Sequence, residues 1–209
     1  EGFDENGDGY FQDWHHHYWC ERGADNLDIS GHVGTAFQEP YSVKWSTKWI
    51  TDQKEGSIKI IARIKDVNGM WYVTEPVENL SLKRNNVSVK MYKSVDFLSG
   101  FAVRNFQAKT SKIRIPPEED LSYATEANLF IRTWNGYSGH HEPFQINGWM
   151  HHFTGNNHNY DLDIVSIPVQ VIRNGDNIIS YYSKTIHHGA EILWPGPAFI
   201  IRYKKNSKH

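Results

Sequence analysis

The sequence has little cysteine, no long apolar run and almost no net charge, and each shortage excludes a class of structure. Cys20 is the only cysteine among 209 residues, so no disulfide can form within the chain. No run approaches the roughly 18 apolar residues of a membrane-spanning helix. A formal net charge of −2 argues against a dedicated nucleic-acid binder. With 22% charged and 39% hydrophobic residues, the chain is typical of globular proteins.

Helical periodicity is also missing before Ser94, whereas short alternating runs recur along the chain. Residues 57–66 alternate strongly and end in a turn signal at residues 66–69. Residues 127–134 alternate again, and residues 174–177 form another turn signal. We therefore predict an all-β protein of two β-sandwich domains, with residues 1–90 in the first and residues 94–209 in the second.

The first half combines the sequence PYSVKWST at residues 40–47 with the predicted strand at 58–66 and the turn at Asn68-Gly69. In these features it resembles bacterial immunoglobulin-like modules. The resemblance covers roughly residues 30–84. It implies an immunoglobulin-like sandwich beside a polysaccharide-active domain.

The second half has a characteristic order of strands around Asn147-Gly148, Asp163-Ile164 and the turn at residues 175–177. In this order it resembles the galactose-binding-like, or jelly-roll, sandwiches used as carbohydrate-binding modules, and the resemblance covers about residues 94–205. Such modules are usually appended to secreted bacterial enzymes that degrade plant or algal polysaccharides. The resemblance therefore implies an extracellular or cell-surface location and a covalently attached catalytic domain. Because the chain opens abruptly on residues 1–4, we expect it to be a piece of a longer protein.

The sharpest chemical signal lies near the start of the chain. Asp4, Asn6 and Asp8 alternate and Gly9 follows, which is the opening of a calcium loop. The loop departs from an EF-hand because its twelfth position is a histidine and no helical pattern flanks it. We predict a structural calcium ion in a β-rich protein, and the alternative is a solvated acidic turn. The predicted ligands are Asp4, Asn6, Asp8, the Tyr10 carbonyl and Asp13.

Three later loops combine aromatic, histidine and other polar residues, at 134–142, 149–160 and 184–191. Flat rings can stack on sugars, and polar side chains can bind hydroxyl or acidic groups. Loops of a sandwich gather at its two ends, so we expect some of these to converge. The predicted ligand-binding residues are Arg132, Trp134, Tyr137, His140, Trp149, His151, His158, Tyr160, His187, His188 and Glu191. Core packing is the alternative for Trp134.

Zinc and catalytic interpretations of the same loops stay open. The histidine pairs at 140–141, 151–152 and 187–188 could supply zinc ligands, but adjacent residues on a strand point to opposite faces. A glycosidase would need two carboxylates, and nothing in the sequence pairs Glu142 with Glu191. A lyase would draw on four residues. These are Arg132, Tyr160, His187 and His188. We assign no catalytic residue.

The predicted function is non-catalytic binding of a polysaccharide, with an acidic or sulfated algal or plant glycan as one candidate, to target an attached enzyme. The first alternative is a β-sandwich polysaccharide lyase or hydrolase. The second is a structural spacer or adhesion module, which would bury most of the loop aromatics. We expect neither nucleic-acid binding nor membrane insertion.

Overall fold

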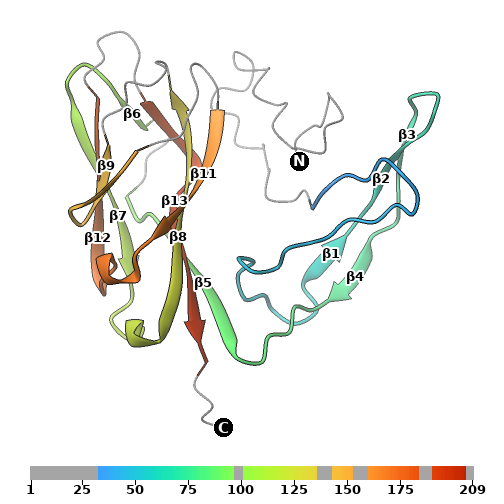
Figure 1. Cartoon of the computed structure of the whole chain (residues 1–209), viewed down its shortest axis with the longest axis horizontal. Coiled ribbons are helices and arrows are strands. Elements are labelled where there is room, and N and C mark those ends of the chain that lie inside the picture. The colour runs from blue at the N-terminus through green and yellow to red at the C-terminus, as the bar shows by residue number, and fades with distance from the viewer. Residues whose placement is uncertain (1–32, 97–100, 136–142, 153–159, 184–189, 206–209) are drawn as a thin grey trace.

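The computed structural model describes residues 33–96, 101–135, 143–152, 160–183 and 190–205, which form strands and two short 3₁₀ helices (Figure 1). All strand pairs between described residues are antiparallel, and the predicted all-β class is confirmed. None of the helices among these residues is long and apolar enough to cross a membrane.

A larger sheet of five strands forms one layer of a sandwich. Its long central strand β13 pairs with β8 on one side and with both β5 and β6 on the other, and β11 lies outside β8. The strands are β5 (Val87–Lys93), β6 (Phe101–Val103), β8 (Ala124–Asn135), β11 (Tyr160–Ile167) and β13 (Ala190–Lys204).

A second sheet of four strands, in the order β10-β9-β12-β7, forms the other layer. The strands are β7 (Ala108–Ile115), β9 (Phe144–Ile146), β10 (Trp149–His151) and β12 (Gly175–Tyr182). The 3₁₀ helices η3 (Leu121–Tyr123) and η4 (Val169–Val171) connect strands. The β9–β10 turn uses Asn147 and Gly148, with φ of 49° and 93°, and positive φ at both positions is typical of Asn-Gly in a two-residue hairpin turn.

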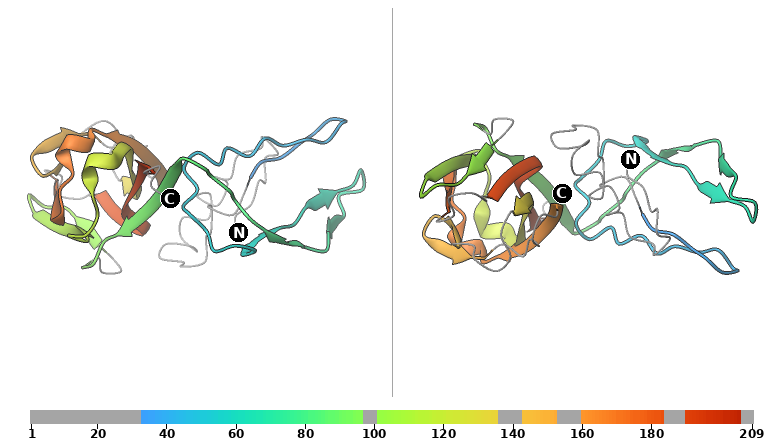
Figure 2. Two further views of the ribbon diagram at one scale, coloured as in Figure 1. Left: turned by 90° about the horizontal axis from the view of Figure 1, so that it is seen from below. Right: turned by 90° about the horizontal axis from the view of Figure 1, so that it is seen from above.

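The core lies between the two sheets, which face each other in the end-on views of Figure 2. Alternate residues of each strand point inward. On β8, Leu129, Ile131 and Thr133 are fully buried, so one of the two faces that the alternation of residues 127–134 predicts lies in the core. Ile179 and Tyr181 of β12 face them from the other sheet.

The sandwich begins earlier than the sequence predicts. β5 pairs with β13 along its whole length, so residues 87–93 belong to the sandwich, whereas the predicted first domain extends to residue 90. Tyr92 explains the difference, because its ring is buried in the core and its hydroxyl lies 3.0 Å from that of Tyr203. That contact joins residues 111 positions apart, which no local pattern reveals.

Residues 33–86, here called the arm, extend away from the sandwich on the side of β5 (Figure 1 and Figure 2). None of these described residues is buried. The arm carries two small sheets. They are the pair of β1 (Ile58–Ile60) with β4 (Val77–Leu80) and the pair of β2 (Arg63–Lys65) with β3 (Trp71–Val73).

The arm differs from its predicted strands in two places. The single strand predicted over residues 57–66 is two strands in different sheets, because Ala62 between them bonds to Thr74 through both its amide and its carbonyl group. Residues 40–47, which carry the immunoglobulin-like resemblance, form no strand. Since residues 1–32 lie outside the described residues, the immunoglobulin-like sandwich at 1–90 stays a prediction.

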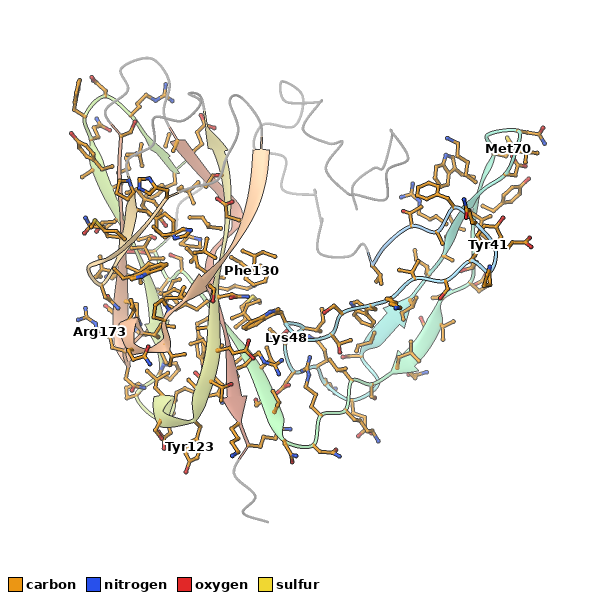
Figure 3. The ribbon with its side chains drawn as sticks, in the orientation of Figure 1. Tyr41, Lys48, Met70, Tyr123, Phe130 and Arg173 are labelled. Carbon is orange, nitrogen blue, oxygen red and sulfur yellow. The ribbon has the colours of Figure 1, made fainter. Side chains whose placement is uncertain are left out.

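The arm contacts the outer face of the five-stranded sheet near Lys48 (Figure 3). The Lys48 ammonium pairs with Glu126 of β8 at 2.5 Å, and the Arg202 guanidinium of β13 lies 5.7 Å from the ring centre of Trp49. The amide of Asp52 donates a 2.8 Å hydrogen bond to the carbonyl of Val89. Val89 is consequently only 1% exposed, although it lies opposite Arg202 on the face turned away from the core.

Candidate functional site

The three aromatic and histidine-rich loops are all attached at one end of the sandwich. Asn135 before the first loop pairs with Ala190 after the third, and the neighbouring Trp134 pairs with Tyr160, which follows the second. On the other sheet, the residues that flank the first two loops also meet, because Phe144 pairs with His151. The attachment points therefore converge. The predicted loop residues Tyr137, His140, His158, His187 and His188 themselves lie outside the described residues.

Three predicted residues share one row across the five-stranded sheet. Tyr160 of β11 is the register partner of Trp134 of β8, which is the partner of Glu191 of β13. Ala102 of β6 ends the row. Direct cross-strand neighbours have Cβ atoms about 5 Å apart. The strands thus bring together positions that are up to 89 residues apart along the chain, from Ala102 to Glu191.

A second row lies two residues further from the loops. It joins Leu162, Arg132 and Leu193. Ile131 and Thr133 of β8 are buried in the core, so strand alternation puts positions 132 and 134 on the opposite, outer face. The outer face near the loops therefore combines the positions of Arg132, Trp134, Tyr160 and Glu191, and we call these four residues the outer-face group.

Glu191 is the member of this group whose side chain the structure describes. It is 9% exposed, and Oε1 lies 4.0 Å from Nη2 of Arg104. A carboxylate accepts hydrogen bonds at both of its oxygens. The sequence interpretation missed Arg104, because no local pattern connects it with a partner 87 positions later.

Trp149 and His151 form a separate pair on the four-stranded sheet. The sequence pattern placed Trp149 in a polar loop, whereas the structure places it in β10, partly buried against the core. Its ring stacks on that of His151, with ring centres 5.4 Å apart and an interplanar angle of 11°. The His151 ring also forms a T-shaped contact with the buried Phe144 ring, with ring centres 5.9 Å apart. This packing matches what the spacer hypothesis expects of these two residues.

Metal binding stays a prediction. The five calcium ligands, Asp4, Asn6, Asp8, Tyr10 and Asp13, lie outside the described residues. Within the described ranges, no group of three or more His, Cys, Asp or Glu residues could hold an ion. Of the histidines weighed as zinc ligands, the structure describes only His151 and His152.

The fold defines an antiparallel β-sandwich, with a candidate binding face on its larger sheet. No family model and no curated protein matches the chain. Among solved structures it is similar to BpGH86A, a β-porphyranase of glycoside hydrolase family 86 from the human gut bacterium Bacteroides plebeius, at 15% identity over 70% of this chain and a TM-score of 0.37. It is also similar to BuGH86wt in complex with neoagarooctaose, at 13% identity over 74% of this chain and a TM-score of 0.38. The chain spans only 29% of the length of each of these proteins.

Proposed function

We propose that the chain binds a polysaccharide without cleaving it, and that the outer-face group is its main contact. The observation that supports this proposal is the strand register, which puts Trp134 and Tyr160 side by side with Glu191 in one row. The row lies at the end of the sheet where the three loops are attached. Two adjacent aromatic residues provide a platform for the apolar face of a sugar ring.

The polar members of the group supply the complementary chemistry. Arg132 carries five N–H donors, which suit hydroxyl, carboxylate or sulfate oxygens. The Glu191 carboxylate accepts hydrogen bonds from sugar hydroxyls. Binding without hydrolysis is favoured because a glycosidase needs two carboxylates about 5 to 10 Å apart. Among the described positions of the two rows, Glu191 is the only carboxylate.

A polysaccharide lyase is the second candidate. The observation in its favour is that Tyr160 and Arg132 occupy adjacent rows of the same face. In a lyase, a tyrosine could remove the proton beside a uronate carboxylate while an arginine neutralises that carboxylate. Binding alone predicts no product, whereas a lyase releases unsaturated ends.

The proposed context is a binding module of a longer, extracellular protein. In it, the module holds an attached catalytic domain near its polymer, and a structural calcium ion orders residues 4–13. A calcium site of this kind would use the hard oxygen ligands that the sequence offers there.

The direct test is a pull-down of the whole chain on insoluble neutral, uronate-containing and sulfated polysaccharides. The same samples are assayed for reducing ends and for the ultraviolet absorbance of unsaturated ends. We expect retention on at least one polymer and no new ends. Release of unsaturated ends would replace the binding proposal by the lyase, and failure of folded protein to bind any polymer would refute both.

A further inference from the structure

The β2–β3 hairpin of the arm gathers two cations around an exposed tryptophan. Lys65 is the cross-strand partner of Trp71, and Arg63 lies two residues before Lys65 on the same face. The Arg63 guanidinium carbon lies 5.0 Å from the Trp71 ring centre, and the Lys65 ammonium lies 5.3 Å from it. Trp71 nevertheless remains 51% exposed. We call these three residues the arm cluster.

The two cations of the arm cluster have no described acidic partner, unlike four other cations of the arm. Neither Arg63 nor Lys65 forms an ion pair with another described residue. Four other cations of the arm do have a described acidic partner. Lys48 pairs with Glu126, Lys59 with Glu78, Lys83 with Glu55 and Arg84 with Asp52. An aromatic ring offsets a cation only partly, so two positive charges are left facing solvent.

The nearest acidic residue in sequence is held elsewhere. Both the Asn68 and Met70 amides donate to Oδ1 of Asp66, at 2.8 and 2.9 Å, and the Tyr72 hydroxyl donates to Oδ2 at 3.3 Å. These hydrogen bonds lower the pKa of the Asp66 carboxyl, and the bond from the Met70 amide has the largest effect. The carboxylate is thereby kept ionised within its turn. Tyr72 alternates with Trp71 along β3, so it belongs to the other face of the hairpin.

We infer that the arm cluster is a second binding site, which takes an anionic sugar unit of the polysaccharide. The exposed part of the Trp71 ring would contact the apolar face of the sugar, and Arg63 and Lys65 would bind its sulfate or carboxylate group. This inference rests on the proposed function, because the same polymer would contact both sites. Nucleic acid is disfavoured, since two cations neutralise few phosphates and the chain carries a formal charge of −2.

The alternative role of the arm cluster is purely structural, because cation–π contacts also stabilise a hairpin. Binding to a matched pair of polymers separates the two roles. The probes are a soluble sulfated galactan and the same galactan after removal of its sulfate esters. A soluble polyuronate is the third probe, and it tells sulfate recognition from recognition of any anion.

The variants are W71A and the double substitution R63Q/K65Q, measured in the whole chain. We expect R63Q/K65Q to weaken binding of the anionic polymer about tenfold and to leave the desulfated galactan unaffected. The affinity of R63Q/K65Q for the anionic polymer should also depend less on salt concentration than that of the parent, because two charge contacts are lost. W71A should weaken binding of the anionic polymer by a similar factor.

The control is K59Q/K83Q, which removes two paired charges from the same arm and should change affinity less than twofold. The conservative R63K/K65R should retain binding, which excludes loss through misfolding.

The outcomes separate this inference from the proposed function. Equal affinity of the parent and R63Q/K65Q for every anionic polymer that the parent binds would overturn the inference. A parent that binds only the desulfated galactan would also overturn the inference, but it would be consistent with the outer-face group as the main contact. Loss of anionic binding in W71A, with full binding in outer-face variants, would support the arm cluster and refute the main contact proposed above. A parent that binds none of the three probes would overturn the inference.

Discussion

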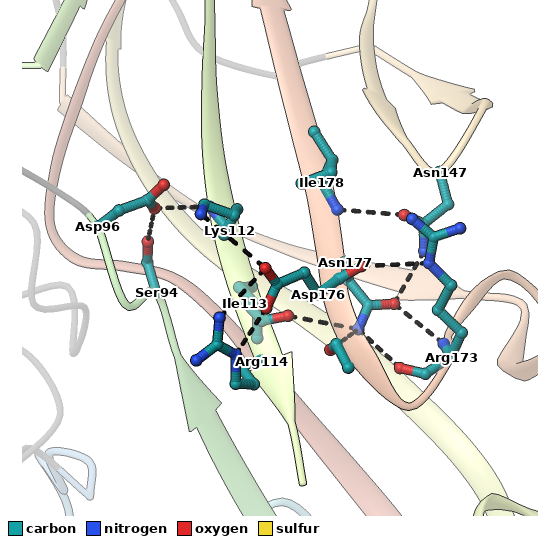
Figure 4. A network of polar contacts seen from close by, with 11 residues as sticks. Ser94, Asp96, Lys112, Ile113, Arg114, Asn147, Arg173, Asp176, Asn177 and Ile178 are labelled. Atoms are coloured by element: carbon teal, nitrogen blue, oxygen red, sulfur yellow. Dashed lines mark hydrogen bonds and ion pairs between the residues drawn. The ribbon is translucent and has the colours of Figure 1, made fainter. Parts of the chain in front are cut away.

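Nδ2 of Asn147 donates a 2.8 Å hydrogen bond to Oδ1 of Asn177, and this contact joins the β9–β10 turn to strand β12 (Figure 4). Asn177 is fully buried, and its own Nδ2 donates to the carbonyl of Arg173 at 2.8 Å. In return, Oδ1 of Asn147 accepts from the amide of Ile178 at 3.1 Å. The two side chains therefore hold the hairpin that carries Trp149 and His151 in place.

Replacing Asn177 should destabilise the sandwich strongly. Asn177→Ala leaves the Asn147 side-chain amide and the buried carbonyl of Ile113 without this partner, so we expect a loss of about 2 to 4 kcal/mol in the free energy of unfolding. Urea denaturation measures it. Gln170→Ala, at an exposed position, is the control and should change stability by less than about 0.5 kcal/mol. A similarly small effect of Asn177→Ala would contradict the role assigned to the network.

The Asp176–Arg114 ion pair gives stability a defined pH dependence. Nε and Nη2 of Arg114 donate to the two carboxylate oxygens of Asp176 at 2.6 and 3.2 Å, and this lowers the pKa of Asp176. A lowered pKa contributes stability above the unfolded value of about 3.9, and the contribution is lost as pH falls through the folded pKa. The difference in melting temperature between the parent and Asp176→Asn should therefore be constant near neutral pH and shrink below about pH 4.

The control for this pH series of melting temperatures is Glu118→Gln, because Glu118 is exposed and has no ion pair with another described residue. It should show no comparable change between pH 7 and pH 3. A difference for Asp176→Asn that grows on acidification would have the wrong sign and would refute the assignment.

Contact between the arm and the sandwich should depend on Trp49. Its ring lies near two cations, those of Lys48 at 5.4 Å and Arg202 at 5.7 Å, and such contacts contribute about 0.5 to 1 kcal/mol each at exposed sites. Trp49→Ala should speed hydrogen exchange of the Asp52 amide, which is bonded to Val89, about fivefold or more. Trp45→Ala is the control, because Trp45 is an arm tryptophan without a described cation–π contact. This variant should leave hydrogen exchange of the Asp52 amide unchanged. Equal exchange in the two variants would show that Trp49 does not hold the arm.

The sequence predicts local features of this fold better than its long-range pairings. The alternation of residues 127–134 predicts a strand with two distinct faces, and Asn147-Gly148 predicts a turn. Both features are present in the structure, because both depend on neighbouring residues. The pairing of β5 with β13 joins distant segments that each alternate in the same way. Periodicity gives no partner for such a strand, so the sequence alone does not show that residues 87–93 belong to this sheet.

The candidate site shows the same limit. Composition singled out Arg132, Trp134, Tyr160 and Glu191 individually, but only the register brings them to one face. The sequence does not single out Trp71, because its cations come from the other strand of the hairpin. The spacing of Arg63 and Lys65 points to a cluster only when the register pairs Lys65 with Trp71.

Removal of calcium should lower stability and leave the binding face intact. If Asp4, Asn6, Asp8, Tyr10 and Asp13 hold a structural ion, EDTA should lower the melting temperature, and added calcium should restore it. Asp8→Asn should reduce this response. If EDTA abolished polysaccharide binding at an unchanged melting temperature, the ion would belong to the ligand site instead.

The central claim is that the outer face of the five-stranded sheet binds the polysaccharide, and its most direct test is the affinity of two single variants. Trp134→Ala and Tyr160→Ala are titrated with a soluble oligosaccharide of the polymer that the parent binds. Each should lose about tenfold or more in affinity, at about 1.4 kcal/mol per tenfold, while the whole chain stays folded. Tyr182→Ala, an exposed tyrosine on the other sheet, is the control and should bind like the parent. Affinities of both variants equal to that of the parent would contradict the claim.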